Sequence, residues 1–283
     1  MRTIESLADL TGRYDALLCD VWGVLHDGVT GYPDAVAALR RARAAGVVVV
    51  LVTNMPRPHP AIPAALAKVG VPRDCWDEVV TSGDLIRDEL AVRAPGPAHQ
   101  LGRGTQALWA GLGLRFVDEL ADAQFLAIAG LERADQDPDD YLPALRAARA
   151  RDLELLCANP DLQIRSGGAL RWVAGAVAER YEQLGGRVVR AGKPHPPIYE
   201  RAREVVAQLA GHVVADSAIL AIGDGIGTDI LGANRAGLDS LFIATGMNGT
   251  SLLDPAGGVD PTCAHAALAA GGATAAYVLP ALV

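Results

Sequence analysis

Lysine is scarce in this sequence, and the basic residues form no cluster. Only Lys68 and Lys193 are lysines among the 25 basic residues, and 33 acidic residues give a formal net charge of −8. Binding to nucleic acid depends on clustered Lys and Arg side chains that neutralise phosphates. We therefore expect no nucleic-acid partner. The use of Lys193 in a chain that otherwise prefers Arg marks that position as a candidate functional residue.

Long apolar runs are also missing. The longest covers residues 44–52 and contains a glycine, whereas a membrane-spanning helix needs about 20 apolar residues. Residues 1–5 carry no apolar signal-peptide region. We therefore expect no membrane partner and a cytoplasmic location.

The four cysteines lie far apart in the sequence, at Cys19, Cys75, Cys157 and Cys263. They form no CxxC pair and no Cys/His pattern with the spacing of a zinc site. We expect them to be small buried side chains in a reducing compartment.

Apolar residues, in contrast, make up 51% of the 283 residues, enough for a sizeable core. The length suggests about two domains. Short apolar runs alternate with stretches of helical spacing; the runs are residues 16–19, 47–52, 218–222 and 241–244, and the helical stretches are residues 35–45, 63–69, 198–209 and 230–236. This alternation predicts an α/β fold with a Rossmann-like, mostly parallel sheet covered by helices on both faces.

The middle of the chain has its own pattern. Two strand candidates, residues 125–129 and 153–157, flank a helix candidate at residues 141–149. We interpret this part as a small α/β unit inserted into the main sheet. The predicted domains are a first core half (1–83), the inserted unit (84–185) and a second core half (186–283).

Polar side chains follow four separate apolar runs. Ligands bind at the carboxyl edge of an open parallel sheet, so we expect these residues to meet there. They are Asp20, the pair Thr53 and Asn54, Lys193 after residues 188–191, and the pair Asp224 and Asp229.

The residue types at this edge suit a phosphate group and a divalent cation. Asp20 could attack phosphorus and form an aspartyl-phosphate. Several carboxylates around one oxygen-preferring cation indicate Mg²⁺. Donors to the phosphate oxygens would come from the side chains of Thr53, Asn54 and Lys193 and from the main-chain N–H groups of Val21, Trp22 and Gly23.

The order of these motifs resembles the haloacid dehalogenase superfamily of hydrolases. Residues 20–25 resemble its first motif, Thr53 and Asn54 the second, Lys193 and Pro194 the third, and residues 223–229 the fourth. The long insertion is similar to the α/β cap of class IIA, which Asn159-Pro160-Asp161 and Arg57 also fit. The resemblance implies a catalytic role for Asp20, Thr53 and Lys193, substrate binding by Arg57, and a metal site at Asp20, Trp22, Asp224 and Asp229.

One position departs from the pattern of the family's phosphatases. Two residues after the nucleophile, those enzymes usually carry a second Asp that serves as general acid and base. Here the residue is Trp22, whose indole has one N–H donor and no titratable carboxyl group. The resemblance therefore implies the nucleophile and the metal but leaves the proton donor open. His26 is one candidate for that role, and the alternative is that it shapes the loop.

Several further alternatives remain open. Asp20 could be a helix N-cap, Thr53 and Asn54 could be turn residues, and residues 223–227 could be mistaken for a dinucleotide loop. Trp22 could stack on a substrate ring or fill the interface with the cap. Arg57 could bind a substrate anion or simply be a surface residue.

The sequence thus predicts a Mg²⁺-dependent hydrolase of a small phosphomonoester, of the sugar or nucleotide type. One alternative is a protein that binds a phosphorylated metabolite with negligible turnover, because Trp22 replaces the acid/base Asp. Another is a hydrolase of a different bond, such as carbon–halogen. The partner we expect is a small phosphorylated metabolite, and the resemblance alone implies a cap-mediated homodimer.

Overall fold

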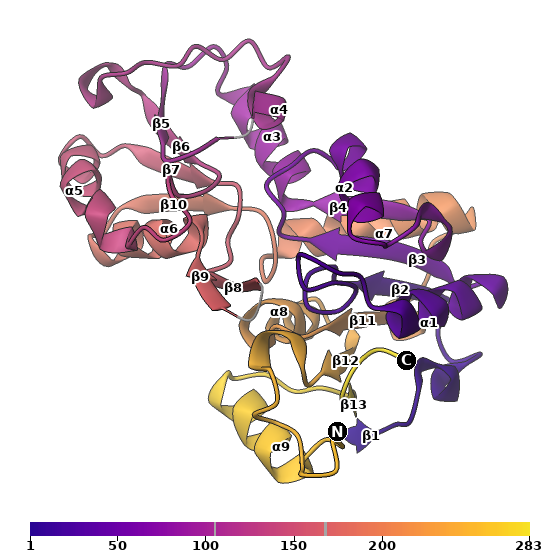
Figure 1. The fold of residues 1–283 in the computed structure, drawn as a ribbon. Helices are drawn as coiled ribbons and strands as arrows, with labels where there is room; N and C mark the ends of the chain where they lie inside the picture. Colours follow the sequence, from indigo (N-terminus) through magenta and orange to yellow (C-terminus); the bar gives the residue numbers. More distant parts are fainter. Residues whose placement is uncertain (105, 167–168) are drawn as a thin grey trace.

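Two parallel β-sheets organise the chain, and they lie side by side (Figure 1). The computed structural model describes residues 1–104, 106–166 and 169–283. The larger sheet has the strand order β1-β13-β12-β11-β2-β3-β4, and every neighbouring pair is parallel. Its strands are β1 (Arg2–Thr3), β2 (Ala16–Cys19), β3 (Val48–Thr53), β4 (Glu78–Thr81), β11 (Ile219–Gly223), β12 (Asp239–Ile243) and β13 (Tyr277–Leu279).

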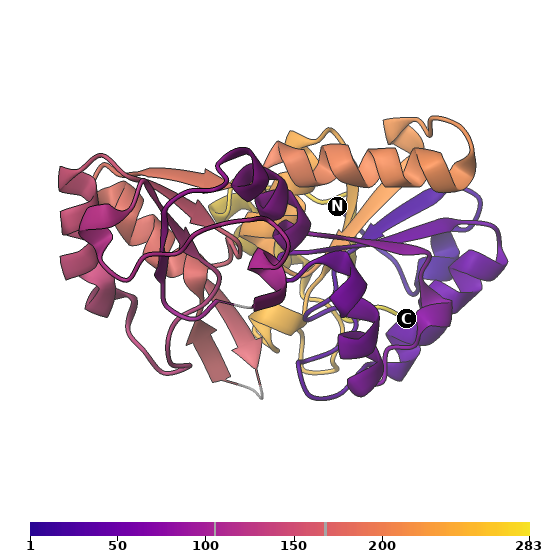
Figure 2. The same ribbon diagram turned by 90° about the horizontal axis from the view of Figure 1, so that it is seen from above.

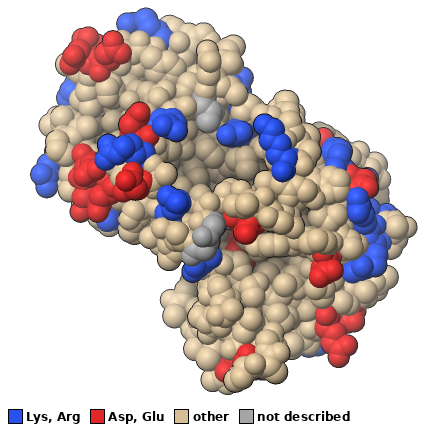
Figure 3. Space-filling model, in the orientation of Figure 1, with Lys and Arg blue, Asp and Glu red and all other residues tan. Residues whose placement is uncertain are grey.

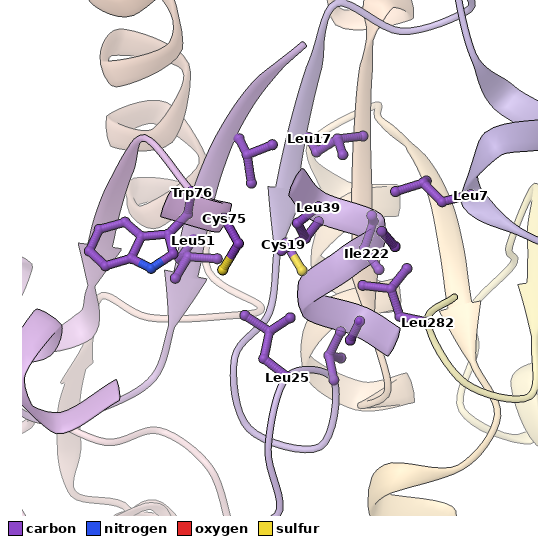
Figure 4. Packing of buried hydrophobic residues seen from close by; sticks show 14 of the residues in the cluster. Leu7, Leu17, Cys19, Leu25, Leu39, Leu51, Cys75, Trp76, Ile222 and Leu282 are labelled. Carbon is purple, nitrogen blue, oxygen red and sulfur yellow. The ribbon is translucent and has the colours of Figure 1, made fainter. Parts of the chain in front are cut away.

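Helices cover both faces of the larger sheet, as Figure 2 shows from above. Alternate strand residues point to opposite faces. On β2, Leu17 and Cys19 pack with helices α1 (Pro33–Ala44) and α2 (Ile62–Lys68), and Figure 4 shows part of this core. Ala16 and Leu18 face the opposite side; the helices there are α3 (Ser82–Val92), α7 (Pro196–Ala210) and α8 (Leu231–Arg235).

The last helix, α9 (Pro261–Ala270), packs against the far end of the same sheet. Its Ala264 and Leu268 contact the core around Phe242 and Val278, on β12 and β13. Burial on both faces explains why the strands are continuous apolar runs rather than alternating ones.

The second sheet is smaller and also parallel, with the order β10-β7-β6-β5. Its strands are β5 (Ala98–Leu101), β6 (Phe125–Ile128), β7 (Glu154–Cys157) and β10 (Arg187–Arg190). Its helices are α4 (Gln106–Trp109), α5 (Leu142–Ala150) and α6 (Ala174–Gln183). A separate antiparallel hairpin, β8 (Gln163–Ser166) and β9 (Ala169–Trp172), extends from this unit toward the larger sheet (Figure 1).

The predicted fold class is confirmed: the chain is α/β, with a parallel Rossmann-like sheet and an inserted α/β unit. One strand assignment was wrong. Residues 188–191 were expected in the larger sheet, but β10 is an edge strand of the smaller one. A short apolar run reveals a strand but not its partner. The division at residues 84–185 stays a prediction, although β10 lies beyond its end.

Three of the four cysteines are buried as expected, but Cys263 is exposed on α9. None of the four forms a disulfide. Within the described ranges, no helix has both the length and the apolar character needed to cross a membrane.

Candidate active site

A cavity of about 590 Å³ lies where the carboxyl ends of the larger sheet face the inserted unit. Its core side contains Asp20, Thr53, Lys193 and the segment from Asp224 to Asp229, and its other side contains residues 160–165. On the molecular surface the two parts of the protein are separated by a hollow, with basic and acidic side chains along its rim (Figure 3). The polar residues that follow the four apolar runs therefore line one cavity.

Lys193 is the centre of a buried ion-pair network. Its Nζ pairs with Asp20 Oδ1, lies 2.7 Å from Asp229 Oδ1, and donates to the carbonyl oxygen of Val52 at 3.0 Å. Asp20 directly follows β2, and its main-chain N–H donates to Ile222 O on β11. The nucleophile predicted from the sequence is thus held by main-chain bonding to the sheet and by a salt bridge to the predicted lysine.

Lys193 reaches this edge although its strand belongs to the other sheet. The side chain of Asn54 holds the lysine segment, because its Oδ1 accepts from Lys193 N at 2.7 Å and its Nδ2 donates to Lys193 O at 3.1 Å. Gly192 is required beside it, since a Cβ there would collide with Asn54 and Ser82. Asn54 is therefore more than a turn residue: it joins the end of β3 to the segment after β10.

The buried charges perturb one another strongly. Burial, and then the Asp229 carboxylate, raise the pKa of Asp20 to about 7 against the opposing effect of Lys193. Burial, followed by Asp20 and Asp229, raises the pKa of Asp224 well above its usual value. Burial alone would lower the pKa of Lys193, but the carboxylates of Asp20, Asp229 and Asp161 outweigh it and hold that pKa well above its usual value.

The excess of buried carboxylates over the Lys193 ammonium fits a divalent cation. Asp20, Asp224 and Asp229 each offer a carboxylate oxygen, and the three oxygens lie within 4.8 Å of one another. Hard oxygen ligands of this kind suit Mg²⁺ or Ca²⁺. Glycines make room for the cluster, because a Cβ at Gly23 or Gly246 would collide with the Asp224 carboxylate.

Main-chain donors fix the two carboxylates of the fourth motif. Met247 N donates to Asp224 Oδ2 at 2.6 Å, and Gly225 N donates to Asp229 Oδ2 at 2.9 Å. Asp229 lies within a π-helical turn, Ile226–Ile230, that precedes α8. The turn directs Asp229 back toward Gly223, where a Cβ would collide with it.

Trp22 has no side-chain place in the carboxylate cluster. An indole nitrogen donates only, and Trp22 Nε1 donates to the carbonyl oxygen of Arg165 on β8 at 2.7 Å. The indole also lines the cavity and packs edge-on against His26, with ring centroids 5.0 Å apart. Of the two alternatives for Trp22, this contact matches the interface role. Its predicted metal contact would have to use the main-chain oxygen and stays a prediction.

Two predicted binding residues lie away from the cavity wall. Arg57 is exposed and is not among the lining residues; its carbonyl oxygen accepts from Thr81 Oγ1 at 2.7 Å. Val21 is fully buried behind Asp20. The substrate contacts predicted for both residues stay predictions.

Sequence reasoning assigned no role to two residues of the inserted unit that face the cavity, Asp161 and Arg165. Asp161 Oδ1 accepts from Asn54 Nδ2 at 2.7 Å. Asp161 lies in the segment after β7, a central strand of the smaller sheet that pairs with both β6 and β10. The rule that polar residues gather at the carboxyl ends of parallel strands could have found it, had it been applied to the second sheet.

His26 lies outside the cavity lining and is buried. Its Nδ1 accepts from Gly28 N at 2.8 Å, and its Nε2 has no hydrogen-bond partner in the described part of the chain. Burial lowers the pKa of His26, against a smaller opposing effect of Asp27. This environment favours a neutral imidazole that shapes the loop over one that exchanges protons with substrate.

We therefore expect the variant His26→Asn to keep the pH–rate profile of the wild type, because its amide oxygen can still accept from Gly28. The pH dependence of folding should change instead. A histidine whose pKa is lowered by folding resists protonation in the folded state, so stability falls as the pH drops below the unfolded value of about 6.5. Urea unfolding at pH 7.5 and 5.5 should show this loss to be smaller in the variant. Loss of a limb in the pH–rate profile would make His26 a proton carrier.

Comparisons with known proteins agree with the geometry. The family model described as haloacid dehalogenase-like hydrolase matches residues 17–124, and a second, HAD-hydrolase-like model matches residues 190–274. A crystal structure of a haloacid dehalogenase-like family hydrolase from Brucella suis 1330 is 43% identical, covers 99% of this chain and 100% of its own, and superposes with a TM-score of 0.87. The fold and the site thus define an enzyme of the hydrolase class. The chain belongs to the haloacid dehalogenase-like hydrolase family.

Two further similarities are to glycerol phosphate phosphatase of Mycobacterium tuberculosis. The D-glycerol 3-phosphate phosphatase is 31% identical over 246 residues, which are 86% of this chain and 66% of that relative's length. This chain therefore spans slightly less than two thirds of that relative. A crystal structure of glycerol phosphate phosphatase in complex with magnesium is 28% identical, covers 89% of this chain and 74% of its own, and has a TM-score of 0.63.

Proposed function

We propose that this protein is a Mg²⁺-dependent phosphatase of small phosphomonoesters. The observation that carries the proposal is the buried cluster of Asp20, Lys193 and Asp229, with Asp224 beside it, at the base of a cavity large enough for a small metabolite. The phosphatase relatives support the same reaction, and the magnesium in one related structure supports the metal.

In this proposal Asp20 attacks the phosphorus atom and forms an aspartyl-phosphate. Thr53 and Lys193, together with main-chain N–H groups of residues 21–23, donate to the phosphate oxygens. Asp224 and Asp229 hold Mg²⁺ beside Asp20. The cation supplies charge stabilisation, because a carboxylate and a phosphate dianion would otherwise repel each other. The class IIA cap, the cytoplasmic location and the homodimer are further parts of the proposal.

The alternative of a binding protein with negligible turnover rests on one observation. Trp22 occupies the position of the usual acid/base carboxylate, and its N–H is engaged with Arg165. A positioned general acid contributes about 10²–10⁴-fold to the rate, so its loss without replacement would slow the reaction greatly. Cleavage of a carbon–halogen bond is less consistent with the site, because a carboxylate can displace a halide without a cluster of cation ligands.

A panel of phosphate esters tests the proposed function. We expect phosphate release from at least one small ester with Mg²⁺, loss of release on addition of EDTA, and recovery when Mg²⁺ is restored. Beryllium fluoride should bind and inhibit as a mimic of the phosphorylated aspartate. Binding of beryllium fluoride without release of phosphate from any ester would instead support the binding protein.

A further inference from the structure

We propose that Asp161 supplies the proton that Trp22 cannot, so that the general acid and base comes from the inserted unit rather than from the nucleophile's own loop. The inference rests on the proposed phosphatase function. It deepens that function by assigning a further catalytic residue.

The position of Asp161 relative to the nucleophile carries the argument. The two residues line the same cavity but enter it from different sheets, Asp20 after β2 and Asp161 after β7. In phosphoryl transfer the attacking and leaving oxygens lie roughly in line, on opposite sides of phosphorus. With Asp20 attacking from the larger sheet, the leaving oxygen faces the inserted unit, where Asp161 lies one hydrogen bond from Asn54.

The other acidic groups that line the cavity are poorly suited to donate a proton to the leaving group. Among the described residues these are Asp20, Asp224 and Asp229 in the cation cluster and Asp27 on the loop after β2. Asp27 Oδ1 accepts from the main-chain N–H groups of Val29 and Thr30, at 2.8 and 2.7 Å. These bonds, that of Thr30 first, lower the pKa of Asp27, so it stays ionised and is a poor proton donor.

Asp161 has the electrostatic environment of a group that can both donate and accept. Burial raises its pKa to about 6, against the opposing effects of Lys193 and the Asn54 hydrogen bond and with a smaller contribution from Asp229. A group with a pKa near the working pH populates both protonation states, which general acid–base catalysis requires. Arg165 is the remaining charged group from the inserted unit in the same cavity lining.

The segment that carries Asp161 is fixed on two sides. A Cβ at Gly175, in α6, would collide with the carbonyl oxygens of Pro160 and Asp161, so the helix packs directly on this segment. On the core side, Trp22 bonds to the carbonyl oxygen of Arg165, four residues further along the chain. Trp22 thus helps to hold the segment that bears the carboxyl group absent from its own position.

Asp161 gives one proton in the first step and takes one back in the second. In the first, Asp20 forms a bond to phosphorus, the bond to the leaving oxygen breaks with its electron pair, and the Asp161 carboxylic acid protonates that oxygen to release an alcohol. In the second, water attacks the aspartyl-phosphate, Asp161 takes the water proton, and Asp20 leaves as a carboxylate. Inorganic phosphate departs, and Asp161 is protonated again.

Esters with different leaving groups distinguish a catalytic role of Asp161 from a structural one. Aryl phosphates need little protonation as they depart, whereas alkyl phosphates need much. We expect Asp161→Asn to lower kcat/KM, which reports formation of the aspartyl-phosphate, by about 10²–10⁴-fold for glycerol phosphate and by less than about tenfold for p-nitrophenyl phosphate. Hydrolysis of the intermediate then lacks its base, so the variant should release p-nitrophenol in a burst. Asp161→Glu, which keeps a carboxyl group, should recover part of the glycerol phosphate activity. Asp216→Asn, a control at an exposed aspartate that pairs with Arg203 outside the cavity, should leave both activities unchanged.

Equal losses of kcat/KM on the two esters in Asp161→Asn would make Asp161 a structural residue and overturn the inference, as would full activity on glycerol phosphate. The wild-type pH–rate profile on the alkyl ester should also contain a limb that Asp161→Asn lacks. Failure of the proposed function would look different, because the wild type itself would then release no phosphate from either ester. Circular dichroism of each variant checks that the fold is retained.

Discussion

Replacing Asp20 with asparagine is expected to abolish phosphate release while the fold stays intact. The amide is a poor nucleophile, so no aspartyl-phosphate can form, and loss of a covalent nucleophile costs on the order of 10⁴-fold or more in kcat. The change keeps the size of the side chain. It removes the repulsion between Asp20 and Asp229 but also the ion pair of Asp20 with Lys193, which keeps its pair with Asp229. Because these effects oppose each other, we expect a small change in the midpoint of unfolding.

The same strand offers a matched control. Asp15 immediately precedes β2, at the opposite end from Asp20, and its side chain is exposed. Asp15→Asn removes the same charge and should keep wild-type turnover. Steady-state phosphate release and urea unfolding of both variants make the comparison. Residual turnover in Asp20→Asn close to that of the wild type would exclude the covalent mechanism.

The second large effect is expected at the cation site. Asp224 contributes one of three clustered carboxylates, and two glycines, Gly23 and Gly246, leave space for it. Asp224→Ala should weaken Mg²⁺ binding at least on the order of 100-fold, since changes even outside the first ligand shell cost 10–100-fold. Turnover at low Mg²⁺ should fall accordingly.

Asp224→Asn tests the charge separately from the volume, because an asparagine can still accept from Met247 N. Asp216→Asn is the control, as Asp216 is exposed and pairs with Arg203 outside the site. Calorimetric Mg²⁺ titration and the Mg²⁺ dependence of phosphate release measure the effect. Unchanged Mg²⁺ affinity in both Asp224 variants would place the cation elsewhere.

Much of this site could be predicted because a parallel sheet gathers strand ends at one edge. Asp20, Thr53 and Asp224 follow apolar runs directly, so the alternation of strands and helices was enough to bring them together. Asp229 was grouped with Asp224 after the same apolar run, and it reaches this edge through the π-helical turn that follows β11. The fold class followed from the same alternation.

Other features depend on contacts between distant segments, which a local pattern does not contain. Lys193 lies at the predicted edge, but not as the end of a strand of the larger sheet. Its strand, β10, belongs to the smaller sheet, and Asn54 holds the lysine segment at the site. The bond from Trp22 to Arg165 joins residues 143 positions apart. Cys263 was expected to be buried, but it lies on the exposed side of α9.

This arrangement gives a physical reason for a tryptophan, rather than an aspartate, at position 22. An aspartate there could not donate to the carbonyl oxygen of Arg165 as the indole does. The loop after β2 thus contributes a contact to the inserted unit, and the inserted unit contributes Asp161 to the cavity. Nucleophile and proposed proton donor are therefore separated between the two halves of the site.

Identification of the phosphorylated residue tests the central claim most directly. The wild type would be mixed with p-nitrophenyl phosphate and Mg²⁺, quenched in acid within the first turnover, digested and analysed by mass spectrometry, with Asp20→Asn treated in parallel. We predict a peptide that contains Asp20 and carries the mass of one phosphoryl group, absent from the variant and sensitive to hydroxylamine. Release of phosphate by the wild type with no phosphorylated Asp20, or with the phosphoryl group on another residue, would contradict the account.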